Sequence, residues 1–463
     1  MNVLVRNAIA IVSPSGSADA PSSSSPSHPP RDLRVTNGVI SQLGRDLQPA
    51  PGESVIDATD CVIYPGLVNT HHHLAQSILK AIPAGLDKPL GDWLAAVPYR
   101  YWPAIDPDIM YSAAIVGLSE QLRSGATTCC DHHYLYHGGG GQAVEEALWQ
   151  AAEDLGIRLV LCRGGATTSG SHRGMRGNAV QPETLAQFVD GLERTRRRYH
   201  QGEDNAMRRL VVAPTSLIHS TTREDLQALA GYARQHALRL HSHLLEVPFD
   251  EQQARERENL SAVDYAASCD WLGSDVWFAH LVHANNEAIG RLAATGTGIA
   301  HCPTSNCRLG SGIAPVLEMA AAGMPVSLGV DGSASSENAS MVQELNLAWL
   351  LHRAQGGAAA TSADTLLRWA SVDAARMVGL PALGEIRVGA PADIVLYALD
   401  QPRYWGLHTP EWAPILCGEP VQVRAALVNG RSVVSNGEVT GIDLPQMRAR
   451  VAEASRRLLE RAG

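Results

Sequence analysis

The chain has 463 residues, of which 45% are hydrophobic and 18% are charged, and its formal net charge is -10. A chain of this length can bury a large core, and its acidic balance argues against a protein that neutralises nucleic-acid phosphates. The eight cysteines include no CxxC pair and no run approaches about 18 apolar residues, so we expect a cytoplasmic protein without disulfides, secretory signal or membrane span.

Short β-like runs open the chain. Two of them, residues 3–12 and 32–43, flank a Ser/Pro-rich stretch, residues 13–30, that cannot form a periodic core segment. We expect this stretch to be an exposed loop between strands. A third run covers residues 54–63.

From Pro65 onward, short apolar runs alternate with helical segments, a pattern typical of βαβ units. Eight of these runs end in polar residues and are the candidate strands: 67–71, 126–131, 158–163, 210–214, 239–243, 277–280, 298–302 and 326–331. Eight strands with helices between them predict an α/β fold, a (β/α)8 TIM barrel over residues 65–383. Reactive side chains are then expected at the C-terminal mouth, where the strands run into the following loops.

Short runs with the pattern of β-strands occur again near the C-terminus. Residues 384–386 and 392–397 have this character, and the Asn429-Gly430 turn predicts a hairpin of 425–428 with 432–435. We therefore predict one small β-sandwich domain built from both chain ends, residues 1–64 and 384–441. An amphipathic helix within residues 442–463 is expected to end the chain.

Histidines and an aspartate stand at the ends of several predicted strands. His71 and His73 are one residue apart, so both imidazoles project to the same side of the first strand. Three later strands end in further candidates, which are His243, His280 and Asp331. Glu246 follows His243 by three positions. Three imidazoles and a carboxylate at one mouth suit Zn²⁺ or Fe²⁺, although spacing alone does not say which histidine is not a ligand.

Five runs around these residues resemble the cytosine/guanine deaminase branch of the amidohydrolase superfamily. They are PGLVNTHHH at 65–73, HSHLLE at 241–246, AH at 279–280, HCPTSN at 301–306 and GVDG at 329–332. The resemblance covers nearly the whole chain. DHHY at 131–134, RGGAT at 163–167 and PRYWGLH at 402–408 are similar to isoxanthopterin deaminases, whereas DHHYL with RLGSGI at 308–313 is equally similar to 8-oxoguanine deaminases.

The resemblance implies a ligand set. His71, His73, His243 and Asp331 would bind the metal, while His280 would contact the attacking water. Two-metal members of the superfamily bridge their metals with a modified lysine at the end of the fourth strand, but the only lysines here are Lys80 and Lys88, soon after the first. A site with one divalent metal follows, with Zn²⁺ as the first choice and Fe²⁺ as the alternative.

A one-metal site of this superfamily suits deamination. We hypothesise that the metal lowers the pKa of water toward neutrality and that hydroxide attacks the ring carbon bearing an amino group. Glu246 would protonate the adjacent ring nitrogen, which requires a carboxyl whose pKa is raised by a dry pocket. Asp331 would take a proton from the water and pass it to the departing ammonia, while His280 polarises the nucleophile. The product is the lactam.

Four residues are candidates for substrate contact. The amide of Gln76 could pair with a ring N–H and a carbonyl, and Trp93 could stack on a flat heterocycle or pack in the core. Arg163 could grip a carbonyl oxygen or form a structural ion pair. His133 could donate to an exocyclic oxygen, although a lone histidine usually has a structural partner.

The substrate ranking places a pterin such as isoxanthopterin first, an oxidised or guanine-type purine such as 8-oxoguanine second and an amino-triazine third. Ala75 is smaller than the aromatic residue expected at that point, and residues 168–178 have no clear match. Two hypotheses belong to other classes: ring-opening hydrolysis of a cyclic amide, and an inert metal-binding scaffold. The expected partner is a small molecule, and a homo-oligomer is the default for such barrels.

Overall fold

The computed structural model describes residues 2–14, 29–136, 140–169 and 181–463. Most of the predicted loop at 13–30, and residues 170–178 of the unmatched segment, lie outside the described residues. Within the described ranges, none of the helices combines the length and apolar character needed to cross a membrane.

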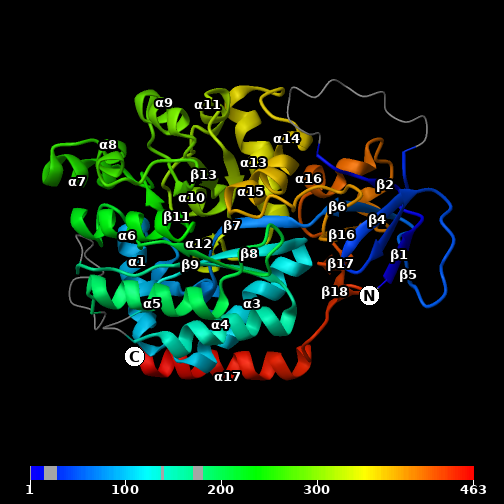
Figure 1. Ribbon diagram of the computed structural model, residues 1–463, viewed down its shortest axis with the longest axis horizontal. Helices are drawn as coiled ribbons and strands as arrows, with labels where there is room; N and C mark the ends of the chain where they lie inside the picture. The colour runs from blue at the N-terminus through cyan, green and yellow to red at the C-terminus, as the bar shows by residue number, and fades with distance from the viewer. Residues whose placement is uncertain (1, 15–28, 137–139, 170–180) are drawn as a thin grey trace.

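A nine-stranded parallel sheet forms the centre of the molecule (Figure 1). In sheet order its strands are β14 (Val326–Leu328), β13 (Gly298–His301), β12 (Val276–His280), β11 (Arg239–Leu244), β10 (Arg208–Val212), β9 (Arg158–Arg163), β8 (Ala126–His133), β7 (Leu67–His73) and β15 (Asp331–Gly332). The two outer strands, β14 and β15, are separated only by Gly329 and Val330, so the two edges of the sheet belong to one chain segment. This arrangement fits the predicted TIM-like barrel, and each of the eight predicted strands overlaps an observed one.

Helices surround this sheet. The α-helices are α1 (Leu90–Ala96), α2 (Pro98–Tyr101), α3 (Pro107–Ser124), α4 (Gln142–Leu155), α5 (Leu185–Tyr199), α6 (Arg223–Gln235), α7 (Pro248–Glu258), α8 (Ala262–Ser268), α9 (Asn286–Thr295), α10 (Pro303–Arg308), α11 (Val316–Ala321), α12 (Ser333–Ser336), α13 (Met341–Gly356), α14 (Ala363–Trp369), α15 (Val372–Met377), α16 (Ala413–Cys417) and α17 (Leu444–Ala462). Short 3-10 helices are η1 (Leu74–Ile78), η2 (Pro83–Gly85), η3 (Trp102–Ala104), η4 (Pro402–Tyr404) and η5 (Pro410–Trp412).

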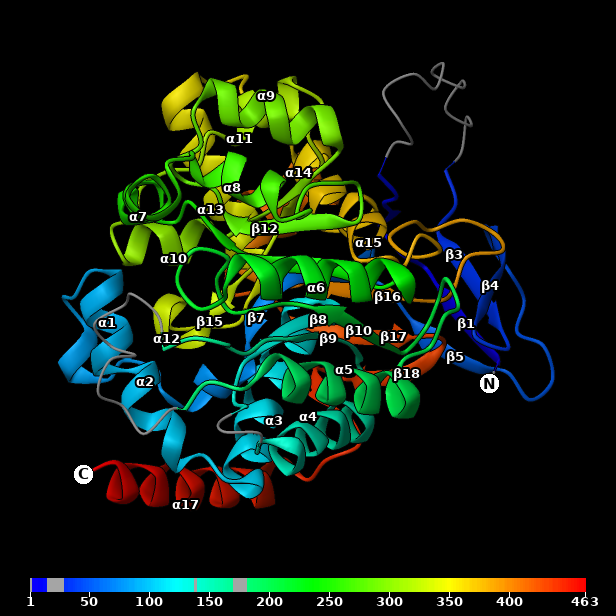
Figure 2. The same cartoon turned by 60° about the vertical axis from the view of Figure 1, so that its left-hand side comes forward.

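Local sequence explains where the helices start and stop. Asp106 caps α3 by accepting a hydrogen bond from the Ile109 backbone, with Pro107 at the first helical position. The same helix ends at Gly125, whose φ of +96° is the left-handed conformation that glycine adopts without strain. α1 and α2 lie at the same end of the barrel as α10 and α12 (Figure 2). That end carries the carboxyl ends of the strands.

Two smaller sheets combine both chain ends. One has the order β4-β3-β1-β5 and the other β19-β18-β17-β16-β6-β2. Their strands are β1 (Asn2–Arg6), β2 (Ala10–Ile11), β3 (Asp32–Thr36), β4 (Val39–Gly44), β5 (Ser54–Asp57), β6 (Cys61–Pro65), β16 (Ile394–Ala398), β17 (Val423–Val428), β18 (Arg431–Ser435) and β19 (Glu438–Val439). One hydrophobic cluster contains residues from both sheets, among them Val5, Val35, Ile63, Ile394 and Leu427.

Two details at the C-terminal end refine the sequence-based expectations. Residues 384–386 form no strand, although Ile386 is buried in the cluster shared by the two sheets. The final helix is present as α17, and it packs along α3 (Figure 1).

Candidate metal centre and active site

Four side chains from β7, β11 and β15 converge at the barrel mouth. Nε2 of His71 and Nε2 of His73 lie 3.3 and 3.2 Å from Oδ1 of Asp331, and Nε2 of His243 lies 3.3 Å from Nε2 of His73. Four ligands held at the roughly 2.0–2.1 Å typical of zinc would stand about 3.3 Å apart at the corners of a tetrahedron. The three observed distances match edges of such a tetrahedron, so the positions of the four side chains are compatible with a single ion.

The other nitrogen of each imidazole is engaged, which turns Nε2 toward the centre. The Nδ1 partners are His241 Nε2 for His71 at 2.8 Å, the His132 carbonyl for His73 at 2.8 Å and the Thr215 carbonyl for His243 at 2.7 Å. Such outer contacts fix the tautomer and orientation of metal-binding histidines. Nε2 of His71 is buried and has no hydrogen-bond partner among the described residues, an arrangement that a metal ion would complete.

Burial also favours the neutral form of two of these imidazoles, those of His71 and His243. It lowers the pKa of His71 and of His243 well below the usual histidine value, and the neighbouring histidines lower it further. Burial disfavours the charged form of Asp331, but contacts with His71 and His73 outweigh it and hold the pKa of this carboxyl well below its usual value. Neutral imidazoles with one carboxylate are the protonation states that bind a divalent metal.

Among the described residues, two overlapping groups of four side chains have ligand atoms that lie within 4.8 Å of one another. One is His71, His73, His132 and His243, and the other is His71, His243, His280 and Asp331. His132 was not a sequence candidate, although it follows Asp131 directly at the end of β8. The contacts of 3.2–3.3 Å join His71, His73, His243 and Asp331, which are the four ligands that the resemblance implies. His280 and His132 lie next to these four residues.

Glu246 and His280 face each other beside the ligands. Oε2 of Glu246 lies 3.5 Å from Nε2 of His280, whose Nδ1 contacts Oδ1 of Asn306 at 2.9 Å. Burial raises the pKa of Glu246 well above its usual value, and the carboxylates of Asp331 and Asp250 raise it further. A carboxyl that keeps its proton in a dry site has the character of a general acid.

The backbone at this mouth is strained. His280 has a φ of +77° and Asp331 a φ of +62°, both in the left-handed region that residues other than glycine rarely occupy. Such conformations persist only where the surrounding structure enforces them, and they concentrate at functional sites.

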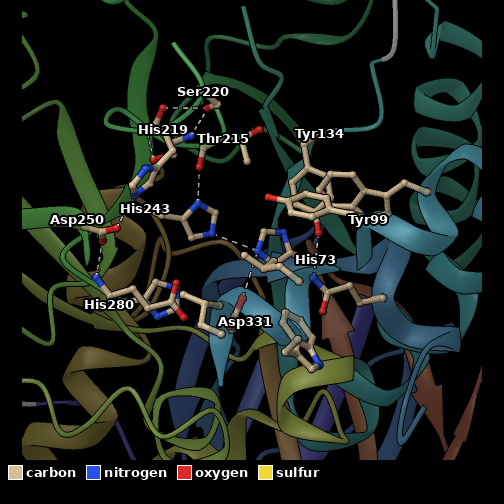
Figure 3. A pocket seen from close by; sticks show the side chains of 17 residues that line it. His73, Tyr99, Tyr134, Thr215, His219, Ser220, His243, Asp250, His280 and Asp331 are labelled. Atoms are coloured by element: carbon tan, nitrogen blue, oxygen red, sulfur yellow. Dashed lines mark hydrogen bonds and ion pairs between the residues drawn. The ribbon is translucent and has the colours of Figure 1, made fainter. Parts of the chain in front are cut away.

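A pocket of about 680 Å³, open solvent at its mouth included, opens onto three of the four converging side chains, those of His73, His243 and Asp331 (Figure 3). Figure 3 shows Tyr99 and Tyr134 on one side and His219 with Asp250 on the other. The lining residues are His73, Gln76, Leu90, Trp93, Leu94, Tyr99, Trp102, Tyr134, Thr215, Ser216, His219, Ser220, His243, Glu246, Asp250, His280 and Asp331. An apolar wall facing a few polar groups is typical of sites for small ligands.

The structure divides the four predicted substrate contacts into two pairs. Gln76 and Trp93 line the pocket, whereas His133 and Arg163 are not among its lining residues. Arg163 makes two hydrogen bonds of 2.7 Å to Glu183, and its guanidinium lies over the rings of Tyr136 and Phe188. This is the structural ion pair that the sequence left as the alternative for Arg163.

Sequence reasoning missed the aromatic wall of the pocket. Trp102 packs against Tyr134 with ring centroids 4.1 Å apart, and Tyr99 meets Trp102 edge-on at 4.6 Å. Tyr134 was visible only as part of the DHHY run. Tyr99 and Trp102 lie in an ordinary apolar stretch, so nothing in the sequence distinguished them from core residues.

Comparisons with known proteins bear on the whole chain. Residues 62–433 match the family model described as Amidohydrolase family. The chain is 44% identical to an isoxanthopterin deaminase from an unknown prokaryotic organism, covering 99% of this chain and 97% of the relative. It is 39% identical to an 8-oxoguanine deaminase from Pseudomonas aeruginosa, covering 92% and 94%.

A solved structure agrees with the fold. The atrazine chlorohydrolase TrzN from Arthrobacter aurescens TC1, crystallised in complex with zinc, superposes with a TM-score of 0.88 at 27% identity. The match covers 98% of this chain and 100% of that structure. The similarity therefore extends over the barrel and the two smaller sheets together.

Proposed function

The chain belongs to the amidohydrolase family, and from this premise we propose that it is a metal-dependent deaminase acting on an amino-substituted bicyclic nitrogen heterocycle. The first substrate is a pterin such as isoxanthopterin, and the products are the lactam and ammonia. One observation carries the proposal: three imidazoles and a carboxylate are joined by contacts of 3.2–3.3 Å, and a pocket is lined by three of these four groups together with a buried carboxyl of raised pKa. The relative at 44% identity, an isoxanthopterin deaminase, supports the choice of a pterin.

One divalent ion, Zn²⁺ in our proposal with Fe²⁺ as the alternative, would be held by His71, His73, His243 and Asp331. When bound, it would supply a Lewis acid that lowers the pKa of water toward neutrality. The zinc complex of the structural neighbour TrzN supports the choice of Zn²⁺. The absence of lysine at the end of β10, where Ala213 and Pro214 stand, supports a single ion.

The protein groups around the ion divide the proton transfers. Asp331 accepts a proton from the attacking water, and His280 accepts a hydrogen bond that orients that water. Glu246 gives its proton to the ring nitrogen adjacent to the attacked carbon, which neutralises the charge that develops there. Asp331 then passes its proton to the departing amino group, and the proton of the newly added hydroxyl returns to Glu246. Water and the amino-heterocycle thereby become lactam and ammonia, and both carboxyl groups recover their starting protonation states.

We assign substrate contact to Gln76 and Trp93, which both line the pocket. For Arg163 and His133 we propose support of the pocket wall in place of direct contact. Arg163 lies over the ring of Tyr136, and the His133 ring meets the same tyrosine edge-on at 5.1 Å. Through these contacts, we propose, His133 and Arg163 fix the C-terminal ends of β8 and β9 behind the pocket wall.

We further propose that the two smaller sheets form one sandwich domain, residues 1–64 with 384–441, beside the barrel at 65–383 and the helix at 442–463. The apolar cluster that both sheets share supports this division. All eight cysteines are free thiols, which supports work in the reducing cytoplasm. A homo-oligomer remains our default for the assembled enzyme.

Ammonia release by zinc-loaded protein tests the proposal. The panel contains isoxanthopterin, pterin, 8-oxoguanine, guanine and an amino-triazine, with Glu246→Gln as the matched variant. We expect release from isoxanthopterin, lowered about 10²- to 10⁴-fold in the variant while its metal content is unchanged. Faster release from 8-oxoguanine would favour the second candidate, which the 39% identical relative supports. Hydrolysis of a cyclic amide without ammonia would instead indicate ring opening, and no turnover at all would leave an inert scaffold.

A further inference from the structure

The side-chain amide of Gln76 is held in one orientation by two neighbours. Its Nε2 donates a hydrogen bond of 2.9 Å to the hydroxyl of Tyr134. Its Oε1 is buried and has no hydrogen-bond partner among the described residues. A buried carbonyl oxygen without a partner is costly, and in a ligand pocket it is a position for a donor of the ligand.

The second neighbour is Gly332, which follows Asp331. A Cβ added to Gly332 would lie 1.8 Å from Oε1 of Gln76, so the amide rests directly on the backbone of this glycine. The φ of -73° and ψ of 137° at Gly332 are open to any residue. The glycine is therefore required for the space that Gln76 occupies and not for its backbone conformation.

Tyr134 is itself fixed. Its ring packs against Trp102 at 4.1 Å and against the imidazole of His73 at 4.8 Å, and Figure 3 shows it beside His73 and Tyr99. The hydroxyl thus has a set position relative to the metal ligands. It lies on the wall opposite His219 and Asp250 (Figure 3).

We propose that Tyr134 and Gly332 are positioning residues that aim Oε1 of Gln76 at a ring N–H next to the reacting carbon. This deepens the proposed function and rests on it. The substrate class that follows is a cyclic amidine with one ring nitrogen carrying hydrogen and the other free to take the proton of Glu246. A heterocycle that offers only acceptors to Gln76 would leave Oε1 unpaired and would be discriminated against.

The first test compares isoxanthopterin with its derivative methylated on the pyrimidine ring N–H, in wild type and in Tyr134→Phe. Phenylalanine keeps the ring packing and removes only the hydroxyl. We expect KM for isoxanthopterin to rise about 10-fold with a smaller change in kcat, because one neutral hydrogen bond contributes about that much. The preference for the N–H compound should fall by a similar factor. Tyr397→Phe is the matched control, since this buried tyrosine donates to the Ser124 carbonyl away from the pocket.

The second test is a double-mutant cycle between Gly332→Ala and Gln76→Ala, with metal content measured in every variant. We expect Gly332→Ala to lower kcat/KM in the wild-type background and to have little further effect when the Gln76 amide is gone. Equal losses in both backgrounds, or an unchanged N–H preference in Tyr134→Phe, would overturn the inference. Lack of ammonia release from isoxanthopterin by the wild type would instead refute the proposed substrate, so the two failures are distinguishable.

Discussion

Ser305 donates a hydrogen bond of 2.5 Å from its hydroxyl to Oδ2 of Asp331. The other carboxylate oxygen, Oδ1, faces His71 and His73. The carboxylate therefore has one oxygen toward the proposed metal and one toward α10, on which Ser305 lies. Ser335 donates to the same Oδ2 at 3.2 Å, so two hydroxyls fix the direction of this side chain.

Loss of the shorter of these bonds should loosen the metal centre. We predict that Ser305→Ala weakens zinc affinity about 10- to 100-fold, the range typical of residues that orient metal ligands. Competition with a chromogenic chelator measures the affinity. Ser327→Ala is the control, because that buried hydroxyl contacts Thr70 and no ligand carboxylate, and its affinity should equal that of the wild type.

Removal of the metal should abolish turnover and lower the thermal midpoint. A ligand that binds only the folded state stabilises it, so extraction with a chelator is expected to lower the midpoint and zinc to restore both properties. Glu246→Gln separates the two effects. The variant should remain nearly inactive at every stage, while its thermal midpoint falls on metal removal and rises on zinc addition as in the wild type. If its midpoint did not respond to zinc, Glu246 would be a metal ligand, which would contradict its proposed role as a general acid.

The strands and the convergence of four metal-ligand candidates could be predicted from the sequence, because each strand is a short apolar run whose last residues are unusual for a core. His71, His73, His243 and Asp331 stand at such ends, and the barrel brings strand ends together whatever separates them in the chain. Substrate contacts lack this regularity. Arg163 also ends a strand, but its partner Glu183 lies 20 residues later in a segment without a motif, so only coordinates reveal the ion pair.

The barrel is tied to the smaller sheets by a buried ion pair. Arg158 at the start of β9 makes hydrogen bonds of 2.8 and 2.9 Å to the two carboxylate oxygens of Asp393, just before β16. Asp393→Ala would leave the buried guanidinium without its counter-charge, which we expect to cost about 3–5 kcal/mol of unfolding free energy. Asp400→Ala breaks the exposed pair with Arg424 and should cost at most about 1 kcal/mol. Denaturant unfolding of both variants at equal metal loading checks the difference, and equal costs would contradict it.

Glu344 on α13 should make stability fall as pH rises. Burial raises its pKa from 4.5 to about 8, although its carboxylate accepts a hydrogen bond from the Thr304 backbone at 3.1 Å. Between these two values the folded chain keeps a proton that the unfolded chain has lost, so the unfolding free energy decreases by up to about 1.4 kcal/mol per pH unit. Below about pH 4.5 and above about pH 8 this group contributes no slope. Glu344→Gln keeps an acceptor for Thr304 and does not titrate, so its stability relative to the wild type should increase from about pH 5 to about pH 8. Urea unfolding at several pH values measures this difference, and a constant offset between the two proteins would show that Glu344 carries its ordinary charge in the folded state.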